Sequence, residues 1–77
     1  MGNAQSVKTK DFRKVIKAWG LQHKRTKGSH ESWAKTGMRR PVIFQSNKKE
    51  LPEFIFKNNL KTMNKTEEQF FATLDSL

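Results

Sequence analysis

The chain of 77 residues contains no cysteine, which excludes disulfide bonds, a thiol nucleophile and a zinc site with cysteine ligands. The absence also agrees with a reducing cytoplasm, the location we expect. No apolar run approaches the roughly 18 residues that span a membrane, so no membrane partner is expected. G-x-S-x-G, H-E-x-x-H and a glycine-rich phosphate loop are all missing. The sequence therefore predicts no metal and no cofactor.

Acidic residues are scarce in the first two thirds of the chain. The formal net charge is +9, and residues 8–49 contain only Asp11 and Glu31 as acids among many Lys and Arg. Residues 50–77 are slightly acidic instead. A positive charge gathered in one part of a chain attracts polyanions, so nucleic acid is the expected partner. The alternative is a charged face that only keeps the protein in solution.

The length allows one domain, which we place at residues 9–77 after a flexible leader at residues 1–8. A domain of this size buries only roughly 60% of the surface of its unfolded chain. The core must therefore be small, and the six Phe and two Trp must supply much of it.

Apolar periodicity predicts a first helix over residues 10–19. One apolar stripe recurs at i, i+3, i+4 and i+7: Phe12, Val15, Ile16 and Trp19. Thr9 is the candidate N-cap, and Gly20 stands where a left-handed residue ends a helix.

Two more helices are predicted near the C-terminus. Pro52 suits the start of one, and Asn64 can end it in a left-handed conformation. Thr66 and Gln69 have the spacing of a capping box, which opens a last short helix.

Residues 21–27, 30–35 and 39–45 read as three strands, with Pro41 marking the third as an edge strand. The predicted fold is α+β, a three-stranded antiparallel sheet with helices packed on one face in the order α-β-β-β-α-α. A two-residue turn at Gly28 and Ser29 would pair Lys27 with His30, Arg25 with Ser32, and His23 with Ala34. Those six side chains would share one face, with Trp33 on the other, toward the helices.

His30 is the candidate catalytic residue, because its imidazole titrates near neutral pH and can move a proton. Lys24, Arg25 and Lys27 can bind a phosphate beside it, and Gly28 and Ser29 shape the turn and offer donors. This set of residue types suits metal-free cleavage of RNA, in which the 2′-hydroxyl attacks the adjacent phosphate.

The sequence resembles the HicA family of bacterial toxins from about residue 10 to the C-terminus. The resemblance rests on these segments: Trp19-Gly20-Leu21, Arg25-Thr26-Lys27-Gly28-Ser29-His30, Trp33, Arg40-Pro41-Val42, Lys48-Lys49-Glu50-Leu51, and Leu60 through Thr66-Glu67-Glu68-Gln69-Phe70.

This resemblance implies a fold like the double-stranded-RNA-binding domain and a metal-independent mRNA interferase of a toxin–antitoxin pair. It implies a HicB-type antitoxin as protein partner. The catalytic histidine of the family falls on His30, its Gly-Ser context on Gly28 and Ser29, and a frequent basic position on Arg25.

Two other functional classes compete with a ribonuclease. A non-catalytic RNA-binding module would use the same basic face, with no special role for His30. A protein-interaction adaptor would use the Phe-rich C-terminal part and bind an acidic protein.

Overall fold

The computed structural model describes residues 7–77. The elements, in chain order, are β1 (Val7–Lys8), α1 (Thr9–Ala18), β2 (Gln22–Lys27), β3 (His30–Ala34), β4 (Val42–Gln45), β5 (Glu50–Leu51), α2 (Glu53–Thr62) and α3 (Glu67–Asp75). Strands β2, β3 and β4 form an antiparallel sheet in that order, and β1 pairs with β5 in a separate two-stranded ladder.

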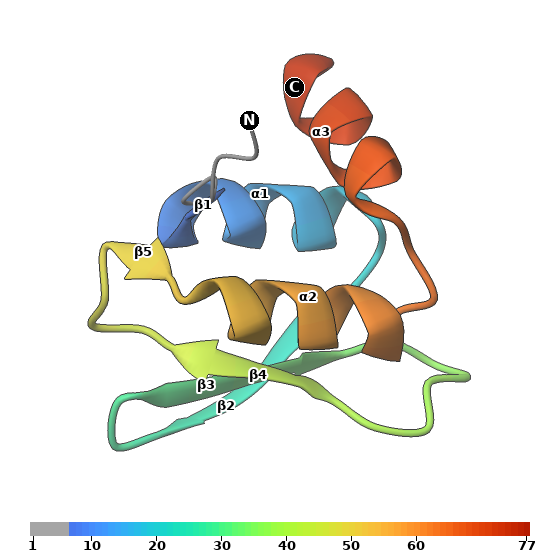
Figure 1. Ribbon diagram of the computed structural model, residues 1–77. Coiled ribbons are helices and arrows are strands. Elements are labelled where there is room, and N and C mark those ends of the chain that lie inside the picture. Colours follow the sequence, from blue (N-terminus) through green and yellow to red (C-terminus); the bar gives the residue numbers. More distant parts are fainter. Residues whose placement is uncertain (1–6) are drawn as a thin grey trace.

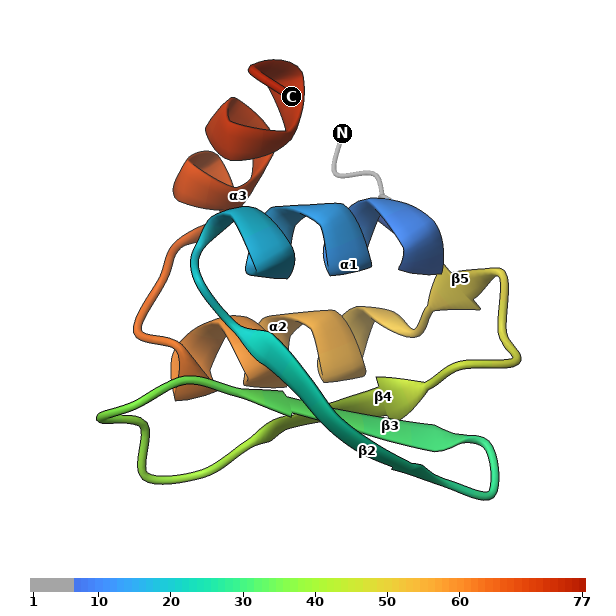
Figure 2. The same ribbon diagram turned by 180° about the vertical axis from the view of Figure 1, so that it is seen from behind.

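Helices α1 and α2 lie on the same side of the three-stranded sheet (Figures 1 and 2). The predicted α+β class, the antiparallel three-stranded sheet and the edge position of β4 are confirmed. Helix α3 packs against α1 and lies away from the sheet. Its apolar residues therefore pack on helices α1 and α2 instead of on the strands.

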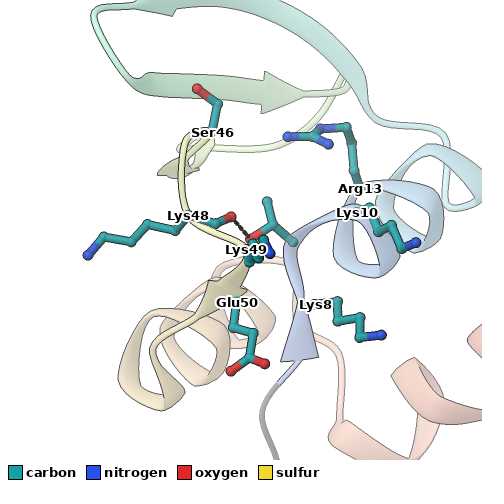
Figure 3. Close-up of a pocket in the computed structure, with 8 residues that line it drawn as sticks. Lys8, Lys10, Arg13, Ser46, Lys48, Lys49 and Glu50 are labelled. Carbon is teal, nitrogen blue, oxygen red and sulfur yellow. Dashed lines mark hydrogen bonds between the residues drawn. The ribbon is translucent and has the colours of Figure 1, made fainter.

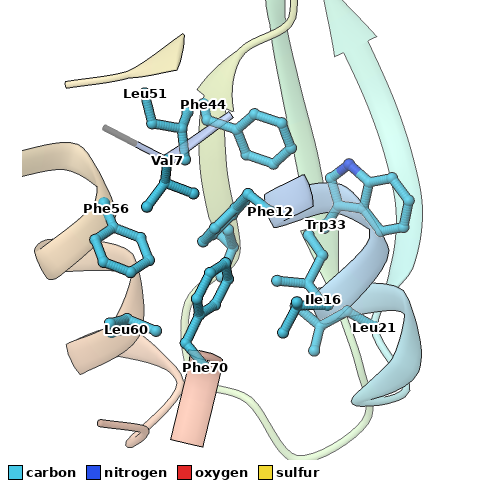
Figure 4. Packing of buried hydrophobic residues seen from close by; sticks show 12 residues of the cluster. Val7, Phe12, Ile16, Leu21, Trp33, Phe44, Leu51, Phe56, Leu60 and Phe70 are labelled. Carbon is cyan, nitrogen blue, oxygen red and sulfur yellow. The ribbon is translucent and has the colours of Figure 1, made fainter. Parts of the chain in front are cut away.

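The core is built around phenylalanine rings contributed by every layer (Figure 4). The Phe12 ring of α1 lies 5.2 Å from Phe44 of β4, 6.2 Å from Phe56 of α2 and 5.9 Å from Phe70 of α3, measured between centroids. Trp33 is buried on the helix-facing side of the sheet, as predicted. Because one ring touches three elements, the few aromatics hold the whole domain together.

Backbone geometry at the helix ends follows the local sequence signals. Gly20 has φ +95°, and the amides of Gly20 and Leu21 donate to the carbonyls of Lys17 and Ile16, which closes α1 in a Schellman motif. Asn64 has φ +58° just beyond α2. The predicted capping box of α3 is present in full.

The start of the domain differs from the sequence-based expectation. Val7 and Lys8, assigned to the leader, pair with Leu51 and Glu50 as β1, and Val7 is buried in the core. The remaining leader positions, 1–6, lie outside the described residues. Thr9 is not the N-cap, a place taken by Lys8. Its hydroxyl donates instead to the Lys48 carbonyl at 2.6 Å, which fastens α1 to the loop before β5.

The hairpin register is as predicted next to the turn and shifts beyond it. Lys27 pairs with His30, and Arg25 pairs with Ser32, but His23 pairs with Trp33 and not with Ala34. Lys24 is the extra residue of a β-bulge, which moves the rest of β2 by one position.

Candidate nucleic-acid interface

His30 is the first residue of β3, and its backbone is fixed by the neighbouring strands β2 and β4. Gly28 has φ +59°, which a glycine adopts without strain, and this lets the chain reverse immediately before His30. The Ser29 carbonyl accepts hydrogen bonds from the Ser46 amide at 2.6 Å and from the Ser46 hydroxyl at 3.1 Å. His30 itself pairs with Lys27 in β2 and Gln45 in β4. Its exposed side chain is therefore presented from a fixed turn.

A partly buried ion pair anchors the strand that carries His30. The Glu31 carboxylate accepts from Arg13 of α1, with its oxygens 3.0 Å from Nε and 2.7 Å from an Nη, and from the Trp33 indole at 2.7 Å. Burial acts to raise the pKa of Glu31, but these hydrogen bonds outweigh it and hold the pKa below its usual value. Glu31 thus stays ionised under the sheet, and it fixes which face of β3 His30 occupies.

Four of the predicted site residues meet on the open face of the sheet. A depression of about 730 Å³ is lined by Arg25, Lys27, Gly28 and His30 together with Ser32, Pro41 and Ile43. Alternation along β3 explains the arrangement, because Glu31 and Trp33 point to the helices while His30 and Ser32 point away. The depression, called the sheet hollow below, places two cations beside the imidazole.

Two predicted site residues do not line the sheet hollow. Lys24 is exposed but belongs to the bulge, and Ser29 is half-buried with its carbonyl engaged by Ser46. The second histidine also lies apart from His30. The His23 ring is 5.6 Å from the Trp33 ring, and its Nε2 lies 2.8 Å from the Thr26 hydroxyl.

A second, more apolar hollow adjoins His30 at the edge of β4. It has a volume of about 350 Å³ and is lined by His30, Ile43, Phe44, Gln45, Lys48, Leu51, Pro52, Phe54 and Ile55. Sequence reasoning assigned only His30 among them to the functional site. Alternation in β4 signals that Ile43 points outward between buried Val42 and Phe44. No local pattern signals that Phe54 of α2 lies beside His30.

A third hollow, of about 370 Å³, lies where the first turn of α1 meets the loop before β5 (Figure 3). Its lining includes five cationic residues, Lys8, Lys10, Arg13, Lys48 and Lys49, with Glu50 the one acid among them. The lysine side chains spread outward around the hollow and do not converge on one point. Lys48 also lines the apolar hollow, so positive charge continues from His30 toward α1.

Residues 7–77 contain no group of three or more His, Asp or Glu side chains placed to hold a metal ion. Within the same residues, no helix has the length and apolar character needed to cross a membrane. The chain matches no protein-family model, no curated protein and no solved structure.

Proposed function

We propose that the protein is a metal-independent endoribonuclease, with His30 as general acid or base. The 2′-oxygen of a ribose gives up its proton and attacks the adjacent phosphorus, while the bond from phosphorus to the 5′-oxygen breaks and that oxygen takes up a proton. The products are a 2′,3′-cyclic phosphate and a free 5′-hydroxyl. Arg25 and Lys27 stabilise the negative charge on the phosphate oxygens.

The observation that carries this proposal is the placement of His30. Its imidazole is exposed in the sheet hollow with Arg25 and Lys27, on a strand locked by Glu31 and Arg13. Exposure to a substrate, nearby cations and a fixed backbone all favour a role in proton transfer, and these three features of His30 support the proposal.

The wider biological role forms part of the same proposal. The order α1, β2, β3, β4, α2, with both helices on one side of the sheet, agrees with a fold like the double-stranded-RNA-binding domain. Together with the resemblance to the HicA family, it supports a toxin of a type II toxin–antitoxin system that cleaves mRNA in the cytoplasm. A HicB-type antitoxin would then be its protein partner.

The test is induced expression of wild type and His30→Ala in a bacterium, with growth and mRNA integrity followed together. Arrest and mRNA fragmentation by wild type, and neither by the variant, are expected. His30 is exposed, so circular dichroism should show the same fold for both proteins. Purified wild type should cleave RNA equally well with a metal chelator present. Cleavage that survives in a folded His30→Ala protein contradicts the assignment.

A non-catalytic RNA-binding module is the second candidate, and one observation favours it. Among the described residues that line the sheet hollow, His30 is the sole imidazole and no carboxylate is present. A binding module would show salt-sensitive affinity that depends on Arg25 and Lys27, no cleavage, and no special loss on substitution of His30.

A further inference from the structure

Large apolar side chains are exposed at three positions in residues 7–77. Ile43 is 47% exposed, Phe54 is 65% exposed and Leu77 is 62% exposed. Leu77 lies at the C-terminus beyond α3, but Ile43 and Phe54 come from different elements and line the same hollow beside His30. Apolar groups gathered beside a candidate reactive group indicate a ligand surface.

The chemistry of this hollow is divided between its floor and its rim. Buried Phe44 and Leu51 form part of an apolar floor, while Gln45, Lys48 and His30 supply polar groups. A nucleobase has matching features, because its faces are flat and apolar, its edge carries donors and acceptors, and its nucleotide carries a phosphate. An exposed aromatic ring such as Phe54 can stack on any base.

The elements that form the hollow are fixed relative to one another. The Asn59 side chain of α2 donates to the Ile43 carbonyl of β4 at 3.0 Å, which ties the helix carrying Phe54 to the edge strand. Thr9 holds the Lys48 carbonyl in the same way from α1. The site therefore exists before a ligand arrives, which lowers the entropic cost of binding.

We propose that the apolar hollow binds one unstacked nucleobase of the RNA, next to the phosphate held at His30. Phe54 stacks on the base, Ile43 packs against it, and the Gln45 amide meets its edge with a donor and an acceptor. This inference rests on the proposed RNA substrate and narrows it. A base paired within an A-form helix cannot offer its face to a side chain, so the substrate is single-stranded at this position.

The experiment measures affinity for short single-stranded 2′-O-methyl RNA, in which the attacking hydroxyl is blocked. Each oligonucleotide of the series lacks one base at a different position. Wild type should lose affinity when one particular base is absent. Phe54→Ala should bind the complete RNA about 5- to 100-fold more weakly and lose nothing further at that position, because stacking is already gone. Phe54→Trp should retain affinity, since Trp also stacks.

Leu77→Ala is the matched control, because it removes an apolar side chain of similar exposure at the C-terminus, beyond helix α3, which lies away from the sheet that carries His30. Phe54→Ala that binds like Leu77→Ala, or that stays sensitive to the same missing base, overturns the nucleobase site. The nucleobase site is also overturned if Phe54→Ala binds RNA as wild type does but binds an acidic protein partner more weakly.

Cleavage of ordinary RNA, measured on the same variants, separates this inference from the proposed function. If wild type does not cleave but its RNA affinity depends on Phe54, the nuclease proposal fails and the base site stands. If wild type cleaves and Phe54→Ala cleaves equally well, the base site fails and the nuclease proposal stands.

Discussion

Replacing Arg13 with methionine removes the partner of a carboxylate that is almost fully buried. The Glu31 side chain is only 7% exposed, whereas the Arg13 side chain is 35% exposed. Methionine keeps an apolar chain against Phe44, over whose ring the guanidinium lies at 5.8 Å, so the substitution mainly removes charge and hydrogen bonds. In the variant only the Trp33 indole still donates to Glu31.

Removing one partner of a buried ion pair typically costs about 3 to 5 kcal/mol. Water reaches part of the Arg13 side chain and screens the pair, so we expect a smaller loss, about 2 kcal/mol at neutral pH. In a domain of this size, such a loss lowers the melting temperature by roughly 8 to 16 °C. Lys14→Met, an exposed site one residue along α1, should change stability by less than about 0.5 kcal/mol.

The loss should depend on pH in a defined direction. In wild type, the stability contributed by the lowered pKa of Glu31 is present above its ordinary pKa of 4.5 and disappears as pH falls through the lower folded value. In Arg13→Met, burial is opposed only by the Trp33 hydrogen bond and the nearby His23, so the pKa of Glu31 rises. The gap in unfolding free energy between the two proteins should therefore narrow as pH falls to 4.5 and below.

Urea denaturation followed by tryptophan fluorescence at neutral and acidic pH measures this gap. A gap of the same size at both pH values would refute the argument from the buried carboxylate. So would a loss at neutral pH no larger than that of Lys14→Met.

Two further substitutions probe the turn and the surface charge. Gly28→Ala should lower the free energy of unfolding, measured by urea denaturation, by about 1 to 2 kcal/mol, because φ is +59° although the space for a Cβ is open. Gly28→Asn should lower it less, since Asn adopts a positive φ more readily. Equal losses in the two variants would contradict this explanation. The logarithm of the RNA-binding constant falls linearly with the logarithm of salt concentration. The double substitution Lys10→Ala and Lys49→Ala should make this slope shallower by about 1.4. Lys17→Ala with Lys61→Ala, exposed lysines outside the third hollow, should leave that slope nearly unchanged, and an equal effect of both pairs would contradict a local contribution.

The sequence predicts the helices and most of their ends well, the N-cap of α1 excepted, because those signals are local. An apolar stripe needs only the spacing of its own residues, and Gly20, Asn64 and the capping box at Thr66 act within one turn of the chain. The turn before His30 is also local, since Gly28 can adopt a positive φ. These signals placed His30, Arg25 and Lys27 correctly on one face of a hairpin.

The bulge at Lys24 could not be predicted in the same way. A strand register predicted from a turn is correct only while each residue of one strand pairs with one residue of the other. The extra residue in β2 shifts the register by one position beyond the bulge. Strand β1 could not be predicted from the local sequence either. Its two residues are stabilised by pairing with β5, more than 40 positions further along the chain.

By itself the sequence determined the basic character of the first two thirds, the order of the main elements and the presentation of His30, because composition and short-range spacing decide all three. Only the tertiary structure brought Phe54 and Lys48 beside His30, buried Glu31 against Arg13 and spread five cations around the start of α1. These contacts join segments far apart in the chain. They depend on how the helices pack on the sheet, and no local pattern of residues encodes that packing.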